Sequence, residues 1–384
     1  MGLWNMEFVR ILDLSTILKQ KSFFLFGPRS TGKSFLIRKQ LRNKSVLVNL
    51  LDGETYLRYS ADASLVHKAA EMAARENKIV VIDEMQKIPS LLDQVHLAIE
   101  ELQVKFLLTG SSARKLKRGG VNLLAGRAWE ARMFPLVYPE ILDFDLTRYL
   151  RYGGLPQVYP SPSPGEELSA YTNTYLKEEI AEEGIIRKMP QFSRFLKVAA
   201  LCSGELINFS TIASDCAVPA STVREYFSIL EQTLIGFNVE PWLESKKRKA
   251  IATAKFYLFD TGVTHVLSGT EHLDRNSNLY GKSFEQWIAM ELRAYLSYRR
   301  IPTDLCFWRS VNGQEVDFVA VKHGKTVYYQ VTASILAEET RERKIRPLRA
   351  IPDNYDKVVL SMDRTPMADY DGIRNENLLE FLLE

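Results

Sequence analysis

The first 145 residues alternate short apolar runs with amphipathic segments. Runs at residues 23–26, 46–50, 78–84 and 105–111 have the length and composition of buried strands. The segments 64–76 and 91–102 carry apolar residues at helical spacing. Strands that alternate with helices predict an α/β fold with a parallel, doubly wound sheet, and a ligand site at the carboxyl ends of its strands.

The end of the first run carries the pattern G-x-x-x-x-G-K-S, which is typical of a phosphate-binding P-loop. Gly27 and Gly32 allow the backbone to curl, so that successive N–H groups face phosphate oxygens. We expect the Lys33 ammonium to reach the β- and γ-phosphates and the Ser34 hydroxyl to bind Mg²⁺. The predicted nucleotide-binding residues are Gly27, Pro28, Arg29, Ser30, Thr31, Gly32, Lys33, Ser34 and Phe35.

The third run ends in two carboxylates, Asp83 and Glu84. Taken alone, such a pair is often just a solvated strand end. After a P-loop, and on a strand of its own, it predicts a Walker B element in which Asp83 holds Mg²⁺ and Glu84 polarises the attacking water. We therefore expect ATP and Mg²⁺ as cofactors, with Ser34 and Asp83 as the metal ligands.

The fourth run ends in hydroxyl residues, and an arginine follows it further along the chain. Thr109 and Ser111 are suited to sensing the γ-phosphate, although capping of the next helix explains each of them equally well. Arg127 comes ahead of a strand-like run at 133–136, on the rim of the predicted sheet. It is either an arginine finger for a neighbouring subunit or a solvated surface residue.

Residues 146–204 are predicted to be helical. A breaker-rich loop at 161–165 precedes helices expected over 168–182 and 191–202. This pattern fits the small helical lid of a nucleotide-binding module, and it equally fits a generic helical linker.

Residues 205–260 predict a winged helix-turn-helix. Helices over 210–216 and 221–230, capped by Ser210 and Ser221, are joined by a short turn. Strands at 237–242 and 255–259 flank a basic tip, and four consecutive cations suit phosphate contact. A solvated hairpin tip, or a helix-turn-helix used for protein contact, remains open. The predicted DNA-binding residues are Thr222, Arg224, Lys246, Lys247, Arg248 and Lys249.

Composition excludes several other classes of protein. The chain is 46% hydrophobic and 25% charged, as in ordinary globular proteins, and its net charge of +3 gives no overall argument for nucleic acid. Three scattered cysteines indicate neither a zinc site nor a disulfide framework. Without a signal peptide or an apolar run near the ~18 residues of a membrane span, we expect a cytoplasmic protein with no membrane partner.

The motifs GPRSTGKS, VVIDEMQKIP, LLTGSS and LAGRA, in this order, resemble those of prokaryotic AAA+ ATPases that carry a C-terminal winged-helix and nuclease-like region. Later marks at 152–156, 256–262 and 281–285 extend the resemblance over nearly the whole chain. The resemblance implies that Lys33, Asp83, Glu84 and Arg127 are the phosphate lysine, the Mg²⁺ carboxylate, the catalytic glutamate and the arginine finger. It also implies a sensor role for Ser111.

Residues 280–384 resemble a PD-(D/E)XK nuclease fold, with Glu285 on a helix and Asp317 on a strand. That pattern requires a second metal carboxylate where Gln330 stands and a lysine where Thr332 stands. A neutral amide is a poor Mg²⁺ ligand, and a threonine cannot activate an attacking hydroxide. We therefore expect a degenerate nuclease domain that does not cut DNA.

The predicted architecture is an AAA+ ATPase core at 1–145, a helical lid at 146–204, a winged helix at 205–270 and a degenerate nuclease-like domain at 271–384. It predicts an ATPase that translocates or remodels double-stranded or branched, Holliday-junction-like DNA, as a homo-oligomeric hexameric ring. The alternative is an ATP-dependent switch, in signalling or defence, that binds DNA or a protein partner and moves nothing.

Overall fold

The computed structural model describes residues 8–112, 114, 116, 124, 126–176, 189–242, 253–310, 312–322, 324–364 and 372–383. They fall into two units, which are described separately. The N-terminal unit comprises residues 8–134 with 229–235, and the C-terminal unit comprises 135–228 and 236–384. No helix in the described ranges is both long and apolar enough to cross a membrane.

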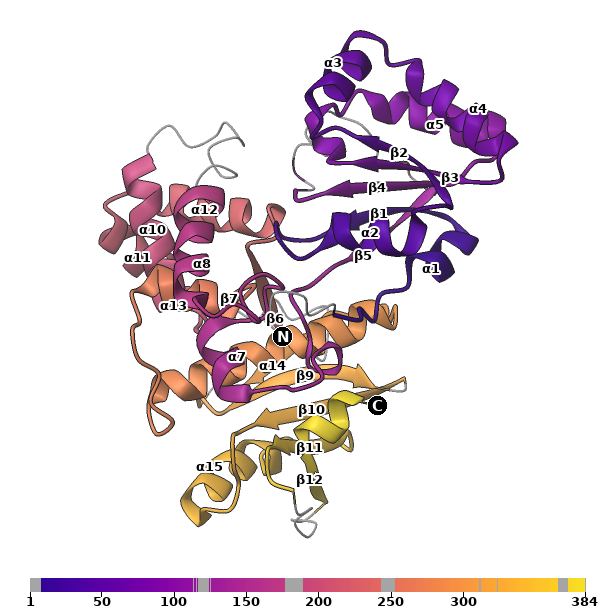
Figure 1. The fold of residues 1–384 in the computed structure, drawn as a ribbon. Coiled ribbons are helices and arrows are strands. Elements are labelled where there is room, and N and C mark those ends of the chain that lie inside the picture. Colours follow the sequence, from indigo (N-terminus) through magenta and orange to yellow (C-terminus); the bar gives the residue numbers. More distant parts are fainter. Residues whose placement is uncertain are drawn as a thin grey trace. The chain divides into compact units, whose positions relative to one another are not determined.

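The N-terminal unit is built on a five-stranded parallel sheet with the order β2-β3-β4-β1-β5 (Figure 1). The predicted parallel sheet is confirmed. Its strands are β1 (Ser22–Phe26), β2 (Ser45–Asn49), β3 (Ile79–Asp83), β4 (Phe106–Gly110) and β5 (Ala128–Arg132).

Helices enclose this sheet. They are α1 (Leu14–Gln20), α2 (Lys33–Leu41), α3 (Gly53–Ala61), α4 (Leu65–Arg75) and α5 (Leu91–Leu102), with a 3₁₀ turn η2 (Met85–Lys87). Phe24, Ile82 and Leu108 belong to the core that includes α4 and α5. Their sequence neighbours Phe23 and Val81 are also buried, so both faces are covered, as a parallel sheet requires.

The last strand of this sheet differs from the prediction. The apolar run at 133–136 is buried but lies outside the sheet, and β5 precedes it. β5 is an edge strand beside β1, and Trp129, Glu130 and Arg132 are exposed. An edge strand with one buried residue among its five shows no apolar run, which is why hydrophobicity alone shifted the prediction along the chain.

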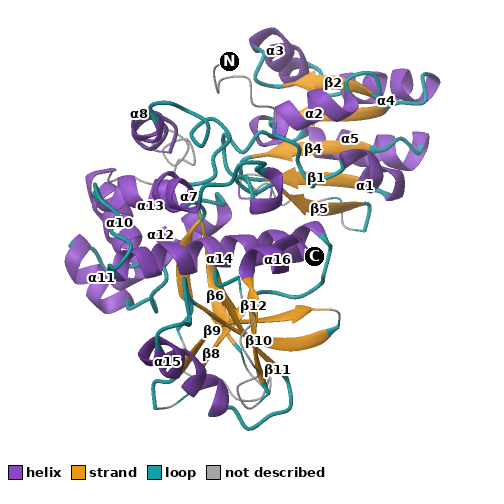
Figure 2. Cartoon of the chain, turned by 60° about the horizontal axis from the view of Figure 1, so that its bottom comes forward, coloured by secondary structure: helices purple, strands orange, loops and turns teal. Residues whose placement is uncertain are grey.

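The C-terminal unit contains a mixed seven-stranded sheet with the order β12-β11-β10-β9-β8-β6-β7 (Figure 2). β6 and β7 form an antiparallel hairpin, and β6 also pairs in parallel with β8. The hairpin predicted as a wing is therefore continuous with the C-terminal sheet. The strands are β6 (Gly236–Pro241), β7 (Lys255–Leu258), β8 (Cys306–Arg309), β9 (Glu315–Lys322), β10 (Lys325–Val331), β11 (Asp356–Ser361) and β12 (Ile373–Asn377).

The helices of the C-terminal unit begin at positions that differ slightly from the predicted ones. Asn208, not Ser210, caps α11, because its side chain accepts the N–H groups of Ser210 and Thr211. The next helix, α12, starts at Ala220, one residue before the predicted Ser221 cap. The helix expected over 168–182 starts earlier, at Pro164, since proline suits a first helical turn, and residues 177–188 lie outside the described ranges.

The helical elements of this unit are η3 (Tyr138–Glu140), α7 (Leu146–Tyr152), α8 (Pro164–Ala170), a π-helical turn η4 (Tyr171–Leu176), α10 (Met189–Leu201), α11 (Phe209–Cys216), α12 (Ala220–Gln232), α13 (Thr261–Ser268), α14 (Asn278–Tyr298), α15 (Glu338–Arg349) and α16 (Leu378–Leu383).

The sequence motifs at 152–156 and 256–262 meet in a packing contact. The buried Asp260 carboxylate accepts the backbone N–H of Gly154 at 2.8 Å and of Val263 at 3.1 Å, which caps α13. Gly153 has φ +75°, and a Cβ there would lie 2.0 Å from Asp260 Oδ1. Only glycine fits, so these motifs have a structural explanation in the joint between α7 and α13.

Candidate nucleotide site and C-terminal cleft

The P-loop follows β1 and enters α2 at Lys33. A Cβ at Gly27 would lie 2.5 Å from the carbonyl oxygen of Met133, so this position has no room for a side chain. Gly32 has φ +93° and Ser30 has φ +63°, which places two residues of the turn in the left-handed region. Such a turn directs consecutive N–H groups inward, toward the position of a phosphate.

Lys33 occupies the interior of the loop. Its ammonium donates to the carbonyl oxygens of Gly27 at 2.6 Å and Pro28 at 2.9 Å. Thr31 Oγ1 donates to the same Pro28 carbonyl at 2.8 Å, and the Arg10 guanidinium donates to the carbonyls of Thr31 and Phe134. Arg10 was not predicted as a site residue, and it braces the loop from outside.

The predicted magnesium ligands lie together. Ser34 Oγ donates to Asp83 Oδ2 at 2.7 Å, and Thr109 Oγ1 donates to Asp83 Oδ1. Two hydroxyls therefore hold the carboxylate, and no lysine or arginine among the described residues pairs with it. Mg²⁺ is commonly bound by one or two protein oxygens together with substrate phosphates, so this pair fits the ion.

Gln86 links the other catalytic candidates. Its amide nitrogen donates to Glu84 Oε2 at 2.5 Å and to Ser111 Oγ at 3.1 Å. Glu84 itself has φ +62°, and its backbone N–H donates to Thr109 Oγ1 at 3.0 Å. Gln86 is only 8% exposed, and its Oε1 has no hydrogen-bond partner in the described structure. Sequence analysis missed this residue, although its place two positions after Glu84 was a usable signal.

The remaining predicted nucleotide-binding residues lie around the same turn. Pro28 is buried and Arg29 is half-buried. Phe35, in the first turn of α2, has 47% of its surface exposed, which leaves a ring available for a ligand.

Arg127 does not join this cluster. It directly precedes β5, and Ala128 is in register with Ser22 at the start of β1, whereas Arg132 is in register with Phe26 beside the P-loop. At about 3.3 Å per residue, Arg127 lies roughly 16 Å along the sheet from the loop of its own chain. Its guanidinium pairs with Glu100 in α5. A finger role is therefore compatible only with a site on another subunit, and it stays a prediction.

The predicted DNA-contacting residues are described only in part. Thr222 is half-buried and Arg224 is exposed on α12, and the Arg224 guanidinium lies 4.0 Å from the ring centre of Phe209 in α11. Lys246, Lys247, Arg248 and Lys249 lie outside the described residues.

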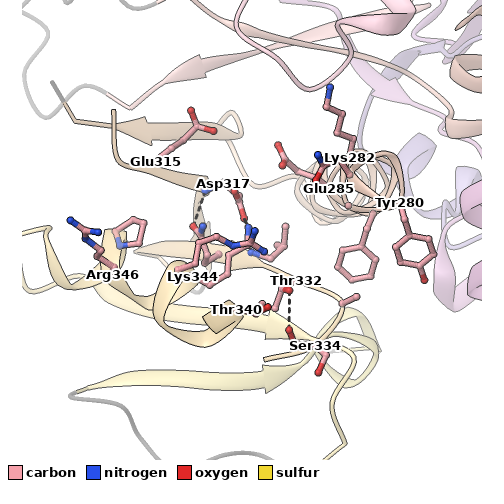
Figure 3. Close-up of a pocket in the computed structure, with 18 of the residues that line it drawn as sticks. Tyr280, Lys282, Glu285, Glu315, Asp317, Thr332, Ser334, Thr340, Lys344 and Arg346 are labelled. Atoms are coloured by element: carbon pink, nitrogen blue, oxygen red, sulfur yellow. Dashed lines mark hydrogen bonds and ion pairs between the residues drawn. The ribbon is translucent and has the colours of Figure 1, made fainter. Parts of the chain in front are cut away.

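The four nuclease-like positions line one cleft of about 1360 Å³ (Figure 3). Glu285 comes from α14, Asp317 from β9, and Gln330 and Thr332 from β10 and its end. Asp317 Oδ2 accepts the N–H of Val331 at 2.8 Å and the ammonium of Lys344 in α15 at 2.9 Å. Among the described residues, no three His, Cys, Asp or Glu side chains converge closely enough to hold a metal ion.

Comparison with known proteins assigns the N-terminal part to a broad class. Residues 19–142 match the model of the AAA domain, and residues 143–274 and 280–374 match two domains of unknown function, DUF8612 and DUF4143. The first match indicates a P-loop ATPase domain, which implies binding of a nucleotide with Mg²⁺. The winged-helix and nuclease-like interpretations remain predictions.

Several relatives span most of the chain, and all of those named here are uncharacterized. A Mycobacterium tuberculosis protein is 26% identical over 80% of this chain and 69% of its own length. A Haemophilus influenzae protein is 24% identical over 93% of each chain. A Methanocaldococcus jannaschii protein is 20% identical over 88% of this chain and 80% of its own. The similarity therefore extends beyond the ATPase domain.

Proposed function

We propose that this protein is an Mg²⁺-dependent ATP hydrolase that uses the nucleotide cycle to remodel or move along duplex or branched DNA. The observation that carries the ATPase part is the 2.7 Å hydrogen bond between Ser34 and Asp83, beside a lysine held inside the P-loop. A hydroxyl and a carboxylate from two different strand ends meet where a phosphate-bound Mg²⁺ belongs.

The residues divide the chemistry between them. When bound, Mg²⁺ neutralises phosphate charge and lowers the barrier to phosphoryl transfer. Lys33 exchanges its two carbonyl partners for β- and γ-phosphate oxygens, which is a favourable exchange for an ammonium. Glu84 accepts the proton of the attacking water, and Gln86 and Ser111 fix the position of its carboxylate.

In this proposal, a neighbouring subunit supplies a further cation, Arg127. Arg127 lies at the amino edge of the sheet and cannot reach the P-loop of its own chain. On a neighbouring subunit of a homo-oligomer, which we propose to be a hexameric ring, it stabilises the charge that develops on the γ-phosphate.

The DNA part rests on the C-terminal unit. Helices α11 and α12 are joined by a short turn and are followed by the β6–β7 hairpin, an order typical of winged-helix proteins. The basic residues 246–249 fall between the two strands, where they would meet a phosphate backbone.

A second candidate function is an ATP-dependent switch. The observation that favours it is the hydrogen bond from Gln86 to Glu84, which occupies the carboxylate that must accept a proton from water. In that case a partner, DNA or protein, would release Glu84 and trigger a single hydrolysis event.

The test is the steady-state ATPase rate without DNA and with linear duplex, single-stranded and four-way-junction DNA. We expect hydrolysis that DNA accelerates, and none in a Glu84→Gln variant that still binds ATP. Wild-type protein without hydrolysis under all conditions would overturn the ATPase proposal. A rate that no DNA changes would remove only the DNA part, and hydrolysis limited to one turnover per partner encounter would favour the switch.

A further inference from the structure

The C-terminal cleft is lined by charged residues that the nucleotide site does not use. It lies among the first turns of α14, strands β9 and β10, and helix α15, all within the C-terminal unit (Figure 3). The nuclease-like pattern of Glu285 and Asp317 implies a divalent cation here. The following contacts show that the residues present do not fit one.

Lys255, in β7, pairs with two of the acidic groups that line the cleft. Its ammonium lies 3.0 Å from Glu285 Oε1 and 2.5 Å from Glu315 Oε1, and the side chain is only 4% exposed. Burial alone lowers the pKa of Lys255, but the charges of Glu285 and Glu315 outweigh burial and raise it. The ammonium is therefore fixed and charged at neutral pH.

The three carboxylates also have other partners. Tyr257 Oη donates to Glu285 Oε1 at 2.6 Å, Arg309 lies 3.1 Å from Glu315 Oε2, and Lys344 lies 2.9 Å from Asp317 Oδ2. Three carboxylates are thus balanced by three cations, Lys255, Arg309 and Lys344. A divalent cation would meet carboxylates whose charges are already balanced, and Gln330 offers only an amide oxygen that already accepts the N–H of Asp317.

With its carboxylates neutralised, the cleft presents a surplus of positive charge at its rim. Arg275 lies on one side, ahead of α14, and Arg343 and Arg346 lie on α15; all three are exposed, and none pairs with a carboxylate in the described structure. Lys282, at the α14 side, is paired with Glu205, and Glu342 is paired with Arg349. Neutral hydrogen-bonding groups, including Gln330, Thr332 and Ser334, lie between the two sides.

The size of the cleft favours an extended anion. About 1360 Å³ exceeds the ~300–1,000 Å³ of typical small-molecule pockets, and cations stand on both sides of it. A chain of phosphates meets cations at intervals, with polar groups between them, which matches this arrangement.

We propose that this cleft binds a nucleic-acid phosphodiester backbone without a divalent cation, because Lys255 and Lys344 neutralise the carboxylates that would otherwise bind a metal ion. The inference rests on the proposed DNA-directed function and assigns a second DNA contact to it, separate from residues 246–249. The cleft grips the backbone and leaves it uncut.

The first experiment measures salt dependence of binding to a fluorescent 25-base-pair duplex by anisotropy, without nucleotide. The test variant is Arg343→Ala/Arg346→Ala, and the charge-matched control is Arg75→Ala/Arg374→Ala, whose residues form surface ion pairs outside the cleft. Each lost phosphate contact lowers the slope of log K against log salt by ~0.9, so we expect the test variant to lose up to ~1.8 and the control to lose almost nothing. Equal slopes for test, control and wild-type protein would overturn the inference.

The second experiment uses the unmodified protein and compares binding in EDTA with binding in Mg²⁺ or Mn²⁺ at equal ionic strength. Binding in EDTA should be at least as tight, and the duplex should stay intact in all three. Loss of binding in EDTA, or metal-dependent cutting, would show that the cleft takes a metal after all. Displacement of the duplex by polyglutamate at equal charge would assign the cleft to an acidic protein instead. ATP hydrolysis without DNA, measured in parallel, separates these failures from failure of the ATPase proposal.

Discussion

The nucleotide site and the C-terminal cleft place lysines beside acidic groups in opposite ways. In the first, Lys33 is bound to backbone carbonyls, and Asp83 is held by the hydroxyls of Ser34 and Thr109. In the second, ammonium groups sit directly on the carboxylates, Lys255 between Glu285 and Glu315 and Lys344 on Asp317.

The difference decides what each site can bind. Hydroxyl partners orient a carboxylate and leave its charge available to a metal, and carbonyl partners leave an ammonium available to phosphate. Ammonium partners cancel the carboxylate charge inside the protein, where separating the two is costly. A site that receives its cation with the substrate is suited to turnover, and a site that contains its own cation is suited to holding a ligand in place.

The largest effect should come from Arg127. Arg127→Ala should bind ATP normally and lose turnover by ~10³ or more, because an arginine finger stabilises the transition state without holding the ground state. Steady-state hydrolysis and equilibrium ATP binding measure the two separately. Mixing this variant with Lys33→Ala subunits should restore some activity, since each supplies what the other lacks.

Glu100→Gln is the matched control, because it releases Arg127 from its ion pair and keeps the guanidinium. It should hydrolyse ATP at close to the wild-type rate. Full activity of Arg127→Ala alone would contradict the finger role of Arg127. Loss of activity in Arg132→Ala would instead assign that role to Arg132, which lies beside the P-loop of the same chain.

Removing the buried ammonium of Lys255 should destabilise the fold. Lys255→Met leaves Glu285 and Glu315 without their buried partner, and the loss of one member of a buried pair costs ~3–5 kcal/mol of unfolding free energy. Urea denaturation measures it. Adding Glu285→Gln and Glu315→Gln should recover much of the loss, because the uncompensated charge is gone.

Lys282→Ala provides the comparison at the same cleft. Its pair with Glu205 is exposed and should contribute only ~0–1 kcal/mol. If Lys255→Met lost as little unfolding free energy as Lys282→Ala, the Lys255 ammonium would not be the cation that balances Glu285 and Glu315.

Local sequence patterns were enough to predict that the P-loop and Asp83 lie close together. Gly27 to Ser34 are contiguous, and Asp83 ends β3 of the same parallel sheet, which brings them to one edge. Gln86 escaped prediction because its meaning depends on burial, and a glutamine after a strand otherwise suggests a surface turn. The neighbourhood of Arg127 was predicted less well, since β5 is too exposed to show as an apolar run.

The cleft was predictable only as a set of separate positions. Lys255 meets residues that are 30 and 60 positions away in sequence, and Lys344 meets Asp317 from a different element. Nothing local distinguishes a lysine that enters a buried strand from one at a solvated hairpin. The absence of the expected lysine at Thr332 was visible, whereas the arrival of two others from elsewhere required the tertiary structure.

Glu291 is a buried carboxylate that pairs with no lysine or arginine among the described residues. It is 3% exposed, and its Oε1 accepts the backbone N–H of Tyr138 and the indole N–H of Trp287, each at 2.8 Å. Burial, with a smaller contribution from Glu140, raises the pKa of Glu291 to about 8. The folded state thus favours the protonated form, and its contribution to stability is complete at pH values below the ordinary carboxyl pKa and is lost as the pH rises through about 8.

Glu291→Gln keeps the accepting Oε1 and removes the titration. The difference between its unfolding free energy and that of the wild type should rise by at most ~1.4 kcal/mol per pH unit as the pH rises from 5 to 8. Urea denaturation at both pH values measures the gap, and the exposed Glu342→Gln should show none of this trend. A gap that stays constant with pH would mean that Glu291 is ionised throughout.

The smallest effect concerns the amide that holds Glu84 in the nucleotide site. Gln86→Leu removes the hydrogen bonds to Glu84 and Ser111 and places an apolar side chain of similar size in the same buried position. A displaced catalytic group costs up to ~10²-fold in rate, so kcat should fall by about that factor. KM for ATP should change little, because Gln86 makes no hydrogen bond to the P-loop among the contacts of the described residues.

Gln86→Glu separates positioning from packing. A second carboxylate beside Glu84 repels its negative charge, so the acidic limb of the pH profile of kcat should move to higher pH. The ammonium of the neighbouring Lys87 lies over Tyr56, and Lys87→Ala should leave the pH profile unchanged. Glu84→Gln gives the residual rate without the catalytic carboxylate. If Gln86→Leu kept the wild-type kcat, or Gln86→Glu kept the wild-type pH profile, Glu84 would be positioned by the backbone alone. The nucleotide site would then depend on a single hydroxyl-held carboxylate, Asp83, for its polar organisation.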